Sequence, residues 1–269
     1  MSRLSDDIRY ADDILNGRNI EMFGFIYSRS NEKLPKLFDC VDVCGKDVYT
    51  VLSSADIFFS AVDGGANSID AFDINPLTYR YYHLRKWLLQ YGRIDADGLS
   101  INNLMSVVNR HLPANSIDED ESVEFWRDYL GKIDSYHFYS NILFEYIERP
   151  AVTYGDRIRE LVQSLCLFEP RFDNVDICGR FEERPNKKYD LVFMSNIFDY
   201  DRDVSRLEDS CANLMSLLND KGSVICSHME KFSGFEVERE LFSNDFEYCE
   251  LFTDKTDTQD VQYYQYTKK

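Results

Sequence analysis

The sequence has little glycine, little proline and a deficit of positive charge. Its 269 residues include 12 glycines and 6 prolines, and 30 Lys+Arg stand against 48 Asp+Glu, which gives a formal net charge of −18. A chain this acidic repels phosphate backbones, and no Lys/Arg run longer than two residues offsets the charge, so we expect neither nucleic acid nor anionic membrane surfaces as partners. Hydrophobic residues still make up 44% of the chain, which is enough for a folded core.

Signals for export, membrane insertion and metal binding are also missing. The start, MSRLSDDIRYADDIL, is acidic and lacks the basic and apolar regions of a secretory signal, and no apolar run approaches the roughly 18 to 20 residues that span a bilayer. The seven cysteines are scattered, which is typical of reduced thiols. Cys40 and Cys44 have no second pair to complete a zinc site. We therefore expect a cytoplasmic protein with no integral membrane segment and no metal.

The first part of the chain alternates between helical and strand patterns. Apolar spacing predicts a helix over residues 5–16, before a turn-rich stretch. KDVYTVLSS (46–54) predicts a first core strand, IFFSAV (57–62) a short helix and NSIDAFDI (67–74) a second strand. Pro76 suits the first turn of the helix that follows. This β-α-β order is typical of parallel strands.

The middle of the chain has a mostly helical pattern, including a predicted helix over residues 138–148, and we expect residues 93–170 to form an inserted helical cap. Strand patterns return in NVDICG, YDLVFMSN and GSVICSH, and a helix is predicted over 204–218. The last two patterns, FEYCELF and VQYYQYTK, are separated by a polar turn. They predict an antiparallel hairpin.

Together these patterns predict an α/β fold. We expect a Rossmann-like, mostly parallel seven-stranded sheet with helices on both faces and an antiparallel C-terminal hairpin. No Gly/Ser/Pro-rich linker divides the sequence, so a single domain is expected over residues 1–269. Residues 1–44 would form an N-terminal helical or lid segment, and 93–170 the helical insertion.

Polar side chains follow three of the predicted strands. They are Ser53, Ser54 and Asp56 after the first strand, Asp73 and Asn75 after the second, and Ser195, Asn196, Asp199 and Tyr200 after the fourth. Asp73 lies 20 positions after Ser53, which is about where nucleotide-binding sheets place the carboxylate that accepts the ribose hydroxyls. A helix cap is the alternative role for Asp73, and the two roles are compatible.

Glycine-rich phosphate loops are missing after the first strand, both of the G-x-G-x-x-G and of the Walker kind. A ribose carboxylate without a phosphate loop suits an adenosine ligand that carries no pyrophosphate. S-adenosylmethionine is the commonest such ligand, so the sequence predicts this cofactor.

The residues that carry these features resemble a known family. KDVYTVLSSADIFFSAVDGGANSIDAFDINPLTYRYYHLRKWLL is similar to the core of class I S-adenosylmethionine-dependent methyltransferase-like proteins. The likeness is to their SSGD-type branch, which includes the aminocarboxypropyl transferases of betaine lipid synthesis and uncharacterised bacterial relatives. IYSRSNE and YDLVFMSNIFDY resemble further segments of that branch, and together these stretches cover roughly a third of the chain. The resemblance implies a Rossmann-like methyltransferase fold.

The resemblance also implies roles for individual residues. The cofactor would lie over the turn that includes Ser53, Ser54 and Asp56, with its ribose on Asp73, its adenine near Asn75 and Phe181, and its methionine moiety near Ser195, Asn196, Tyr27 and Arg29. The family has glycine where this chain has Ala55, so the backbone would approach the cofactor less closely.

Transfer from a sulfonium needs alignment more than covalent help, yet an acceptor that carries a proton needs a base. The candidates are Asp199, our first choice, with Tyr200, His228 and Glu230; a solvated loop residue is the alternative for each. We expect a transferase, by default a methyltransferase, acting on a small molecule or lipid-like metabolite. The alternatives are 3-amino-3-carboxypropyl transfer with the same cofactor, and a non-catalytic binding or scaffold protein that retains the fold. The sequence leaves the oligomeric state open.

Overall fold

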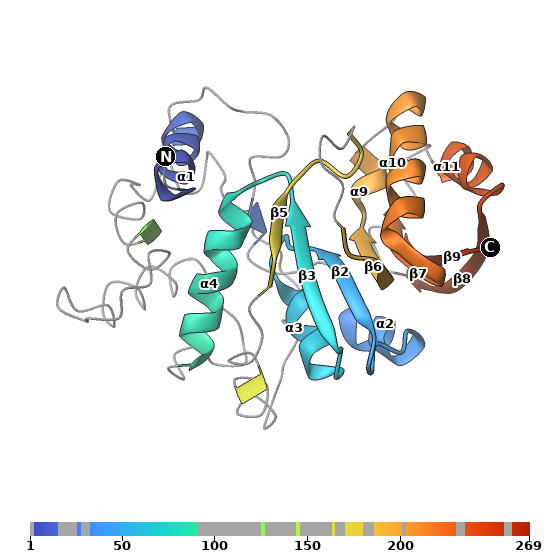
Figure 1. Ribbon diagram of the computed structural model, residues 1–269, viewed down its shortest axis with the longest axis horizontal. Coiled ribbons are helices and arrows are strands. Elements are labelled where there is room, and N and C mark those ends of the chain that lie inside the picture. The colour runs from blue at the N-terminus through green and yellow to red at the C-terminus, as the bar shows by residue number, and fades with distance from the viewer. Residues whose placement is uncertain are drawn as a thin grey trace. The chain divides into compact units, whose positions relative to one another are not determined.

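The structure is a computed structural model, and its ribbon is drawn in Figure 1. It describes residues 3–15, 26–27, 33–90, 125–126, 144–145, 163–164, 170–179, 186–200, 203–229, 235–255 and 260–269. The chain forms two compact units. The first unit comprises Met1–Asn31, Leu52–Asp56 and Asn75–Leu167, and the second, which we call the sheet unit, comprises Glu32–Val51, Ile57–Ile74 and Phe168–Lys269.

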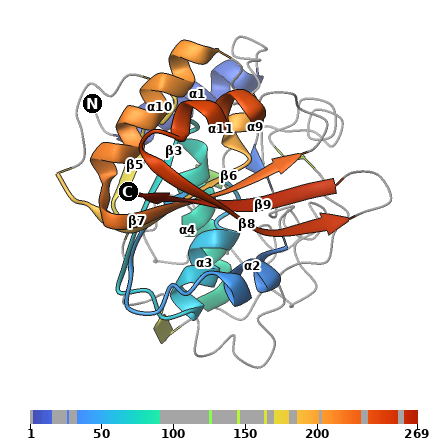
Figure 2. The same ribbon diagram turned by 90° about the vertical axis from the view of Figure 1, so that its right-hand side faces the viewer.

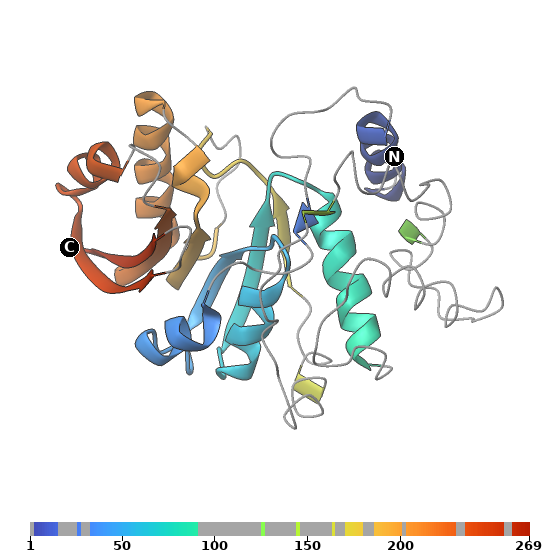
Figure 3. The ribbon, with the colours of Figure 1, turned by 180° about the vertical axis from the view of Figure 1, so that it is seen from behind.

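A seven-stranded sheet organises the sheet unit. Its strands, in spatial order, are β5 (Phe172–Asn174), β3 (Ser68–Asp73), β2 (Asp47–Val51), β6 (Tyr189–Ser195), β7 (Leu218–Met229), β9 (Asp260–Lys268) and β8 (Phe246–Lys255). The first five run parallel to one another, whereas β9 runs antiparallel to both of its neighbours. The hairpin of β8 and β9 at the C-terminal end is visible in Figure 3. The predicted mostly parallel seven-stranded sheet with an antiparallel hairpin is confirmed.

Helices cover both faces of this sheet. Figure 2 shows α2 (Leu34–Cys40) and α3 (Asp56–Asp63) on one face, and α9 (Ile197–Tyr200), α10 (Val204–Leu217) and α11 (Phe235–Phe242) on the other. The start of α10 is fixed locally, because the Asp203 side chain accepts a hydrogen bond from the Ser205 amide at 2.9 Å. The centre of the sheet is covered on both faces: four of the five residues of β2 are buried. This is typical of parallel strands covered by helices.

Several local predictions were wrong. The third strand is Phe172–Asn174, and the residues after it turn, because the Asp176 side chain accepts a hydrogen bond from the Cys178 amide at 3.0 Å. β7 begins at Leu218, four residues before the predicted strand GSVICSH, and Lys221 within it has a φ of 64°. The turn-rich stretch before the first core strand contains α2, and neither α9 nor α11 was predicted.

The first unit includes α1 (Arg3–Leu15), α4 (Leu77–Gln90) and a short parallel pair, β1 (Ile26–Tyr27) with β4 (Phe144–Glu145). The strand at β4 contradicts the helix predicted over 138–148. Most of the predicted cap, residues 93–170, lies outside the described residues. A buried ion pair joins the two helices, with Arg80 Nε 2.7 Å from Asp7 Oδ2. Among the described helices, none is long and apolar enough to cross a bilayer.

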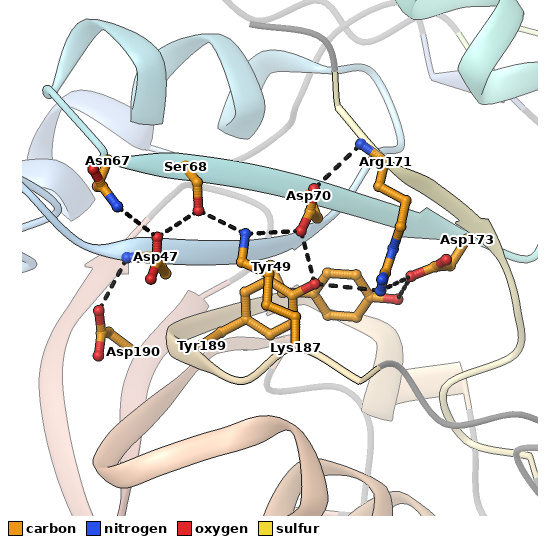
Figure 4. Close-up of polar contacts among 10 residues, drawn as sticks. All are labelled: Asp47, Tyr49, Asn67, Ser68, Asp70, Arg171, Asp173, Lys187, Tyr189 and Asp190. Carbon is orange, nitrogen blue, oxygen red and sulfur yellow. Dashed lines mark hydrogen bonds and ion pairs between the residues drawn. The ribbon is translucent and has the colours of Figure 1, made fainter.

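A polar network lies across the parallel strands of the sheet unit (Figure 4). The rings of Tyr49 in β2 and Tyr189 in β6 stack with centroids 4.8 Å apart. The Tyr49 hydroxyl donates to Asp173 Oδ2 at 3.0 Å, and the Tyr189 hydroxyl donates to Asp70 Oδ2 at 2.9 Å. Lys187 Nζ also reaches Asp70 Oδ2, at 3.0 Å. The network therefore links β2, β3, β5 and β6 through directional bonds.

The tyrosines of the network remain protonated. Burial is the main cause that raises the pKa of Tyr49, and the charge of Asp173 adds to it. Burial likewise raises the pKa of Tyr189, with Asp70 as the next cause. Each hydroxyl thus stays a donor to a carboxylate. A hydrogen bond to a charged group is stronger than one between two neutral groups.

We expect Tyr49→Phe to lower the free energy of unfolding by about 1 to 2 kcal/mol, because the Asp173 carboxylate loses a buried donor while the ring packing is kept. Tyr248→Phe is the matched control, since its hydroxyl accepts only a 3.3 Å contact from Gln262 and the side chain is half-buried. The control should cost less than about 0.5 kcal/mol. Urea unfolding of the three proteins measures both changes, and equal losses would contradict the role of the network.

Candidate functional site

The carboxyl ends of the parallel strands meet at one edge of the sheet unit. Asp73 closes β3, Ser195 closes β6, and His228 lies one residue before the end of β7. Along the chain the strands go outward from β2 to β3 and β5, and then return to the other side of β2 with β6 and β7. The switch in strand order therefore falls between β2 and β6. Ligands of open α/β sheets bind at this edge, close to such a switch.

Asp73 is 8% exposed and sits where the sequence predicted a ribose carboxylate. Its backbone oxygen accepts hydrogen bonds from the Val175 amide at 3.1 Å and from Asn174 Nδ2 at 2.9 Å. Asn174 Nδ2 also donates to the Ile74 oxygen at 2.9 Å. The Asn174 side chain therefore holds the backbone at Asp73 and Ile74 in place. Sequence reasoning missed Asn174, because its partners lie about a hundred residues away along the chain.

The turn after β2 belongs to the first unit and is held by a buried ion pair. Ser54 Oγ donates to Asp56 Oδ2 at 2.9 Å, and Arg85 Nη2 lies 2.8 Å from Asp56 Oδ1. Arg85 Nη1 also donates to the backbone oxygen of Ser54. All three residues are less than 10% exposed. The contacts favour Asp56 as a residue that shapes the turn. Arg85 was missed, although a charged residue in the aromatic stretch of α4 is a signal for such a buried partner.

Residues with strained backbone lie at the end of β6 and directly after β2. Among the described non-glycine residues, Ser53, Ala55 and Ser195 have positive φ, at 42°, 66° and 54°, and Lys221 is the fourth. Left-handed backbone costs a residue with a Cβ roughly 1 to 2 kcal/mol, and such strain gathers at functional sites. Ala55 occupies the position where the resembled family has glycine, which has no such cost.

The helix cap expected as the alternative role of Asp73 is made by Asn75. Its Oδ1 accepts a hydrogen bond from the Leu77 amide at 2.9 Å, at the start of α4, and the residue is 1% exposed. Thr78 Oγ1 adds a bond to the Asn75 oxygen at 2.8 Å. Asn75 thus holds the entry into α4 within the first unit.

Two of the proposed catalytic residues are joined in the sheet unit. His228 Nδ1 makes a short hydrogen bond with Asp199 Oδ1, and Asp199 Oδ2 accepts from the Met229 amide at 2.9 Å. Both side chains are buried, and the ring of Phe235 stacks on that of His228 with centroids 4.9 Å apart. The imidazole is therefore fixed by one hydrogen bond and one stacking contact.

A second buried acid lies near the Asp199–His228 pair. Glu238 of α11 is 2% exposed, and its Oε1 accepts from the Tyr264 hydroxyl at 3.0 Å. Tyr264 packs edge-on against Phe235, with centroids 5.0 Å apart. Burial, with the charge of Asp199 as a lesser cause, raises the pKa of Glu238 to about 8. Sequence reasoning missed Glu238, because its partner Tyr264 lies 26 residues away along the chain.

The other predicted site residues are placed less fully. Ser195 Oγ lies 3.3 Å from Asn196 Oδ1, and Asn196 Nδ2 lies 3.9 Å from Met229 Sδ. Tyr27 is in β1 and Tyr200 is in α9, but their side chains lie outside the described residues. So do Arg29, Phe181 and Glu230. Within the described part of the chain, no three His, Cys, Asp or Glu residues form a cluster that could hold a metal ion.

Comparison with known proteins gives structural likenesses only. No family model matches the sequence, and no curated protein matches it. The N-methyltransferase NodS from Bradyrhizobium japonicum in complex with S-adenosyl-L-homocysteine is 7% identical, with 97% of this chain and 98% of that chain covered and a TM-score of 0.45. A TehB-like SAM-dependent methyltransferase from Corynebacterium glutamicum is 10% identical, with 98% and 99% covered and a TM-score of 0.44.

A third solved structure, an rRNA methylase from Streptococcus thermophilus, is 6% identical, with 87% of this chain and 94% of that chain covered and a TM-score of 0.42. Because every one of these TM-scores is below 0.5, the fold assignment rests on the strand order and directions of the sheet unit itself.

We expect Ala55→Gly to change the free energy of unfolding by less than about 0.5 kcal/mol, because relief of the left-handed strain offsets the lost methyl group and the added chain entropy. Ala61→Gly is the matched control, since Ala61 is equally buried but lies in the regular helix α3. In the control, the free energy of unfolding should fall by about 1 to 2 kcal/mol. Denaturant unfolding compares them, and equal losses would contradict strain at Ala55.

We expect Glu238→Gln to make stability less dependent on pH. The pKa of Glu238 is about 8 in the folded state and about 4.3 in the unfolded state. Glu238 therefore binds its proton more tightly in the folded state. Its contribution to the free energy of unfolding is fully present below about pH 4 and is lost as the pH rises toward 8. The variant should gain up to about 3 kcal/mol at pH 7 and little at pH 4. Urea unfolding at both pH values measures the gain.

Glu236→Gln is the control for this change, since Glu236 is an exposed carboxylate on the same helix. It should leave the pH dependence as in the parent protein. A Glu238→Gln gain of the same size at pH 4 and pH 7 would show that the effect is packing rather than ionisation.

Proposed function

We propose that the protein is an S-adenosylmethionine-dependent transferase, a methyltransferase by default, that acts on a small molecule or lipid-like metabolite. The observation that carries the proposal is the buried carboxylate of Asp73, at the carboxyl end of the parallel strand next to β2, beside the switch in strand order. A carboxylate at this place suits the two hydroxyls of an adenosine ribose. The strained backbone at Ser195, on the same edge, supports a bound ligand there.

The residues of this edge fit the proposed cofactor. Asp73 would accept hydrogen bonds from the ribose hydroxyls, and Ser195 and Asn196 would supply a hydroxyl and an amide for the polar end of the molecule. When bound, S-adenosylmethionine supplies an alkyl group on a sulfonium that leaves readily. The protein's own contribution is then to align the acceptor and exclude water.

The charge of the chain favours a small acceptor. At −18, the protein would repel an RNA or DNA substrate, because binding such a backbone requires clustered Lys and Arg side chains. A neutral or cationic metabolite meets no such barrier. We therefore propose a cytoplasmic metabolite as the acceptor, rather than nucleic acid.

We expect calorimetric titration to show binding of S-adenosylhomocysteine to the parent protein, and Asp73→Ala to weaken it by about ten- to a hundredfold, because one or two charge-assisted hydrogen bonds are lost. Asp47→Ala is the control, since Asp47 lies at the opposite, amino end of β2 and bonds Ser68 and Asn67. The control should bind as the parent does and unfold at a lower temperature, because its bonds to Ser68 and Asn67 are lost.

Two results decide between the readings of this titration. Absence of binding to S-adenosylmethionine, S-adenosylhomocysteine and methylthioadenosine at millimolar concentration would contradict the proposed function and favour a scaffold protein. Tighter binding of methylthioadenosine than of S-adenosylhomocysteine would favour aminocarboxypropyl transfer, because that reaction leaves methylthioadenosine as its product.

A further inference from the structure

The paired side chains of Asp199 and His228 come from two elements at the carboxyl edge of the sheet unit. Asp199 is carried by α9, directly after β6, and His228 by the end of β7. The Met229 amide donates to Asp199 Oδ2, so the carboxylate is bonded to the same stretch of β7 that carries the imidazole. The pair is therefore fixed relative to the end of β7 by the backbone as well as by its own hydrogen bond.

The hydrogen bond determines which imidazole nitrogen is basic. An ionised carboxylate can only accept, so His228 Nδ1 must donate the proton in its bond to Asp199. Nε2 of a neutral ring then carries the lone pair. In the described part of the chain, Nε2 makes no hydrogen bond with another residue. The stacked Phe235 ring holds the imidazole plane.

We propose that His228 is the general base of the transfer reaction and that Asp199 is its positioning residue; this rests on the proposed function. In the transfer, the acceptor heteroatom forms a bond to the methyl carbon while the carbon–sulfur bond breaks and its electron pair goes to sulfur. The acceptor proton goes to Nε2 of His228. The products are the methylated acceptor, S-adenosylhomocysteine and a protonated imidazole, which returns its proton to water.

This assignment differs from our expectation that Asp199 is the base. Both oxygens of the Asp199 carboxylate already accept hydrogen bonds, one from His228 and one from Met229, which disfavours proton removal from an acceptor. A carboxylate in this arrangement holds the imidazole in one tautomer and stabilises its protonated form. His228 takes the proton.

A base at this site also indicates the acceptor class. An amine with a free lone pair can attack a sulfonium without prior loss of a proton, whereas a hydroxyl group is a weak nucleophile until its proton is removed. The pair therefore favours an acceptor that carries an alcohol or phenol hydroxyl.

The test measures carbethoxylation of His228 by diethylpyrocarbonate, which modifies unprotonated imidazole, with the rate at each histidine followed by peptide mass spectrometry. In the free protein we expect His228 to react, and Asp199→Asn to slow it by about tenfold or more, because the amide can stabilise the wrong tautomer. His83, on α4, is the internal control and should react equally in both proteins.

A second arm adds ligands to the parent protein at saturating concentration. Sinefungin carries an amino group where S-adenosylmethionine carries its transferable methyl group, so it should protect His228 severalfold more than S-adenosylhomocysteine does. Equal rates with both ligands, when calorimetry shows that both bind, would overturn the role of His228 as the base while leaving the proposed function intact. Absence of binding would overturn both.

Failure of His228 to react in the free parent protein would also overturn the proposal, because Nε2 would then be closed to an acceptor. If Asp199→Asn does not fold, ring nitrogen chemical shifts of the parent protein replace that arm. A neutral ring protonated at Nδ1 supports the proposal, and a ring protonated at Nε2 overturns it.

Discussion

Tyr49, at the centre of β2, packs between aromatic rings from both neighbouring strands, 4.7 Å from Phe72 and 4.8 Å from Tyr189. This packing and the hydrogen bonds to Asp173 and Asp70 hold β3, β2 and β6 in one parallel register. The register decides where each strand ends, and therefore that Asp73 and the β6 end, at Ser195, reach the same edge. A slip of one residue would turn these side chains toward opposite faces, so the site depends on this packing.

The sheet combines a well-satisfied centre with a strained edge. Around Tyr49 the buried hydroxyls are paired with half-buried carboxylates, and such pairing stabilises the fold. At the carboxyl end of β6, Ser195 adopts a left-handed backbone that costs free energy, and Asp73 and Asp199 are buried acids. Local sequence preference favours none of these features. Their position on one edge of the sheet, rather than scattered through it, is what points to ligand binding.

The sequence reveals those parts of the fold that have a local pattern. β2, β3, β6, α10 and the final hairpin follow from alternating or helical hydrophobicity, which depends on neighbouring residues alone. Shorter elements such as α2, α9 and β1 have too few residues to show a period. The partners Arg85, Asn174 and Glu238 were missed for another reason. Each acts through contacts with residues distant in sequence, so only the folded chain shows that Arg85 meets Asp56 or that Glu238 meets Tyr264.

Glu238 is a second buried acid near the Asp199–His228 pair, and its raised pKa affects the charge around the imidazole. Two negative charges in a poorly solvated interior disfavour each other, so one of two neighbouring acids keeps its proton. Both acids accept hydrogen bonds, but Glu238 is enclosed by the aromatic rings of α11 and β9, and burial raises its pKa to about 8. Near neutral pH, Glu238 therefore keeps its proton and adds no negative charge beside the Asp199–His228 pair. The carboxylate of Asp199 is bonded at Nδ1 of the imidazole, and this arrangement leaves Nε2 for the acceptor proton in the reaction we propose.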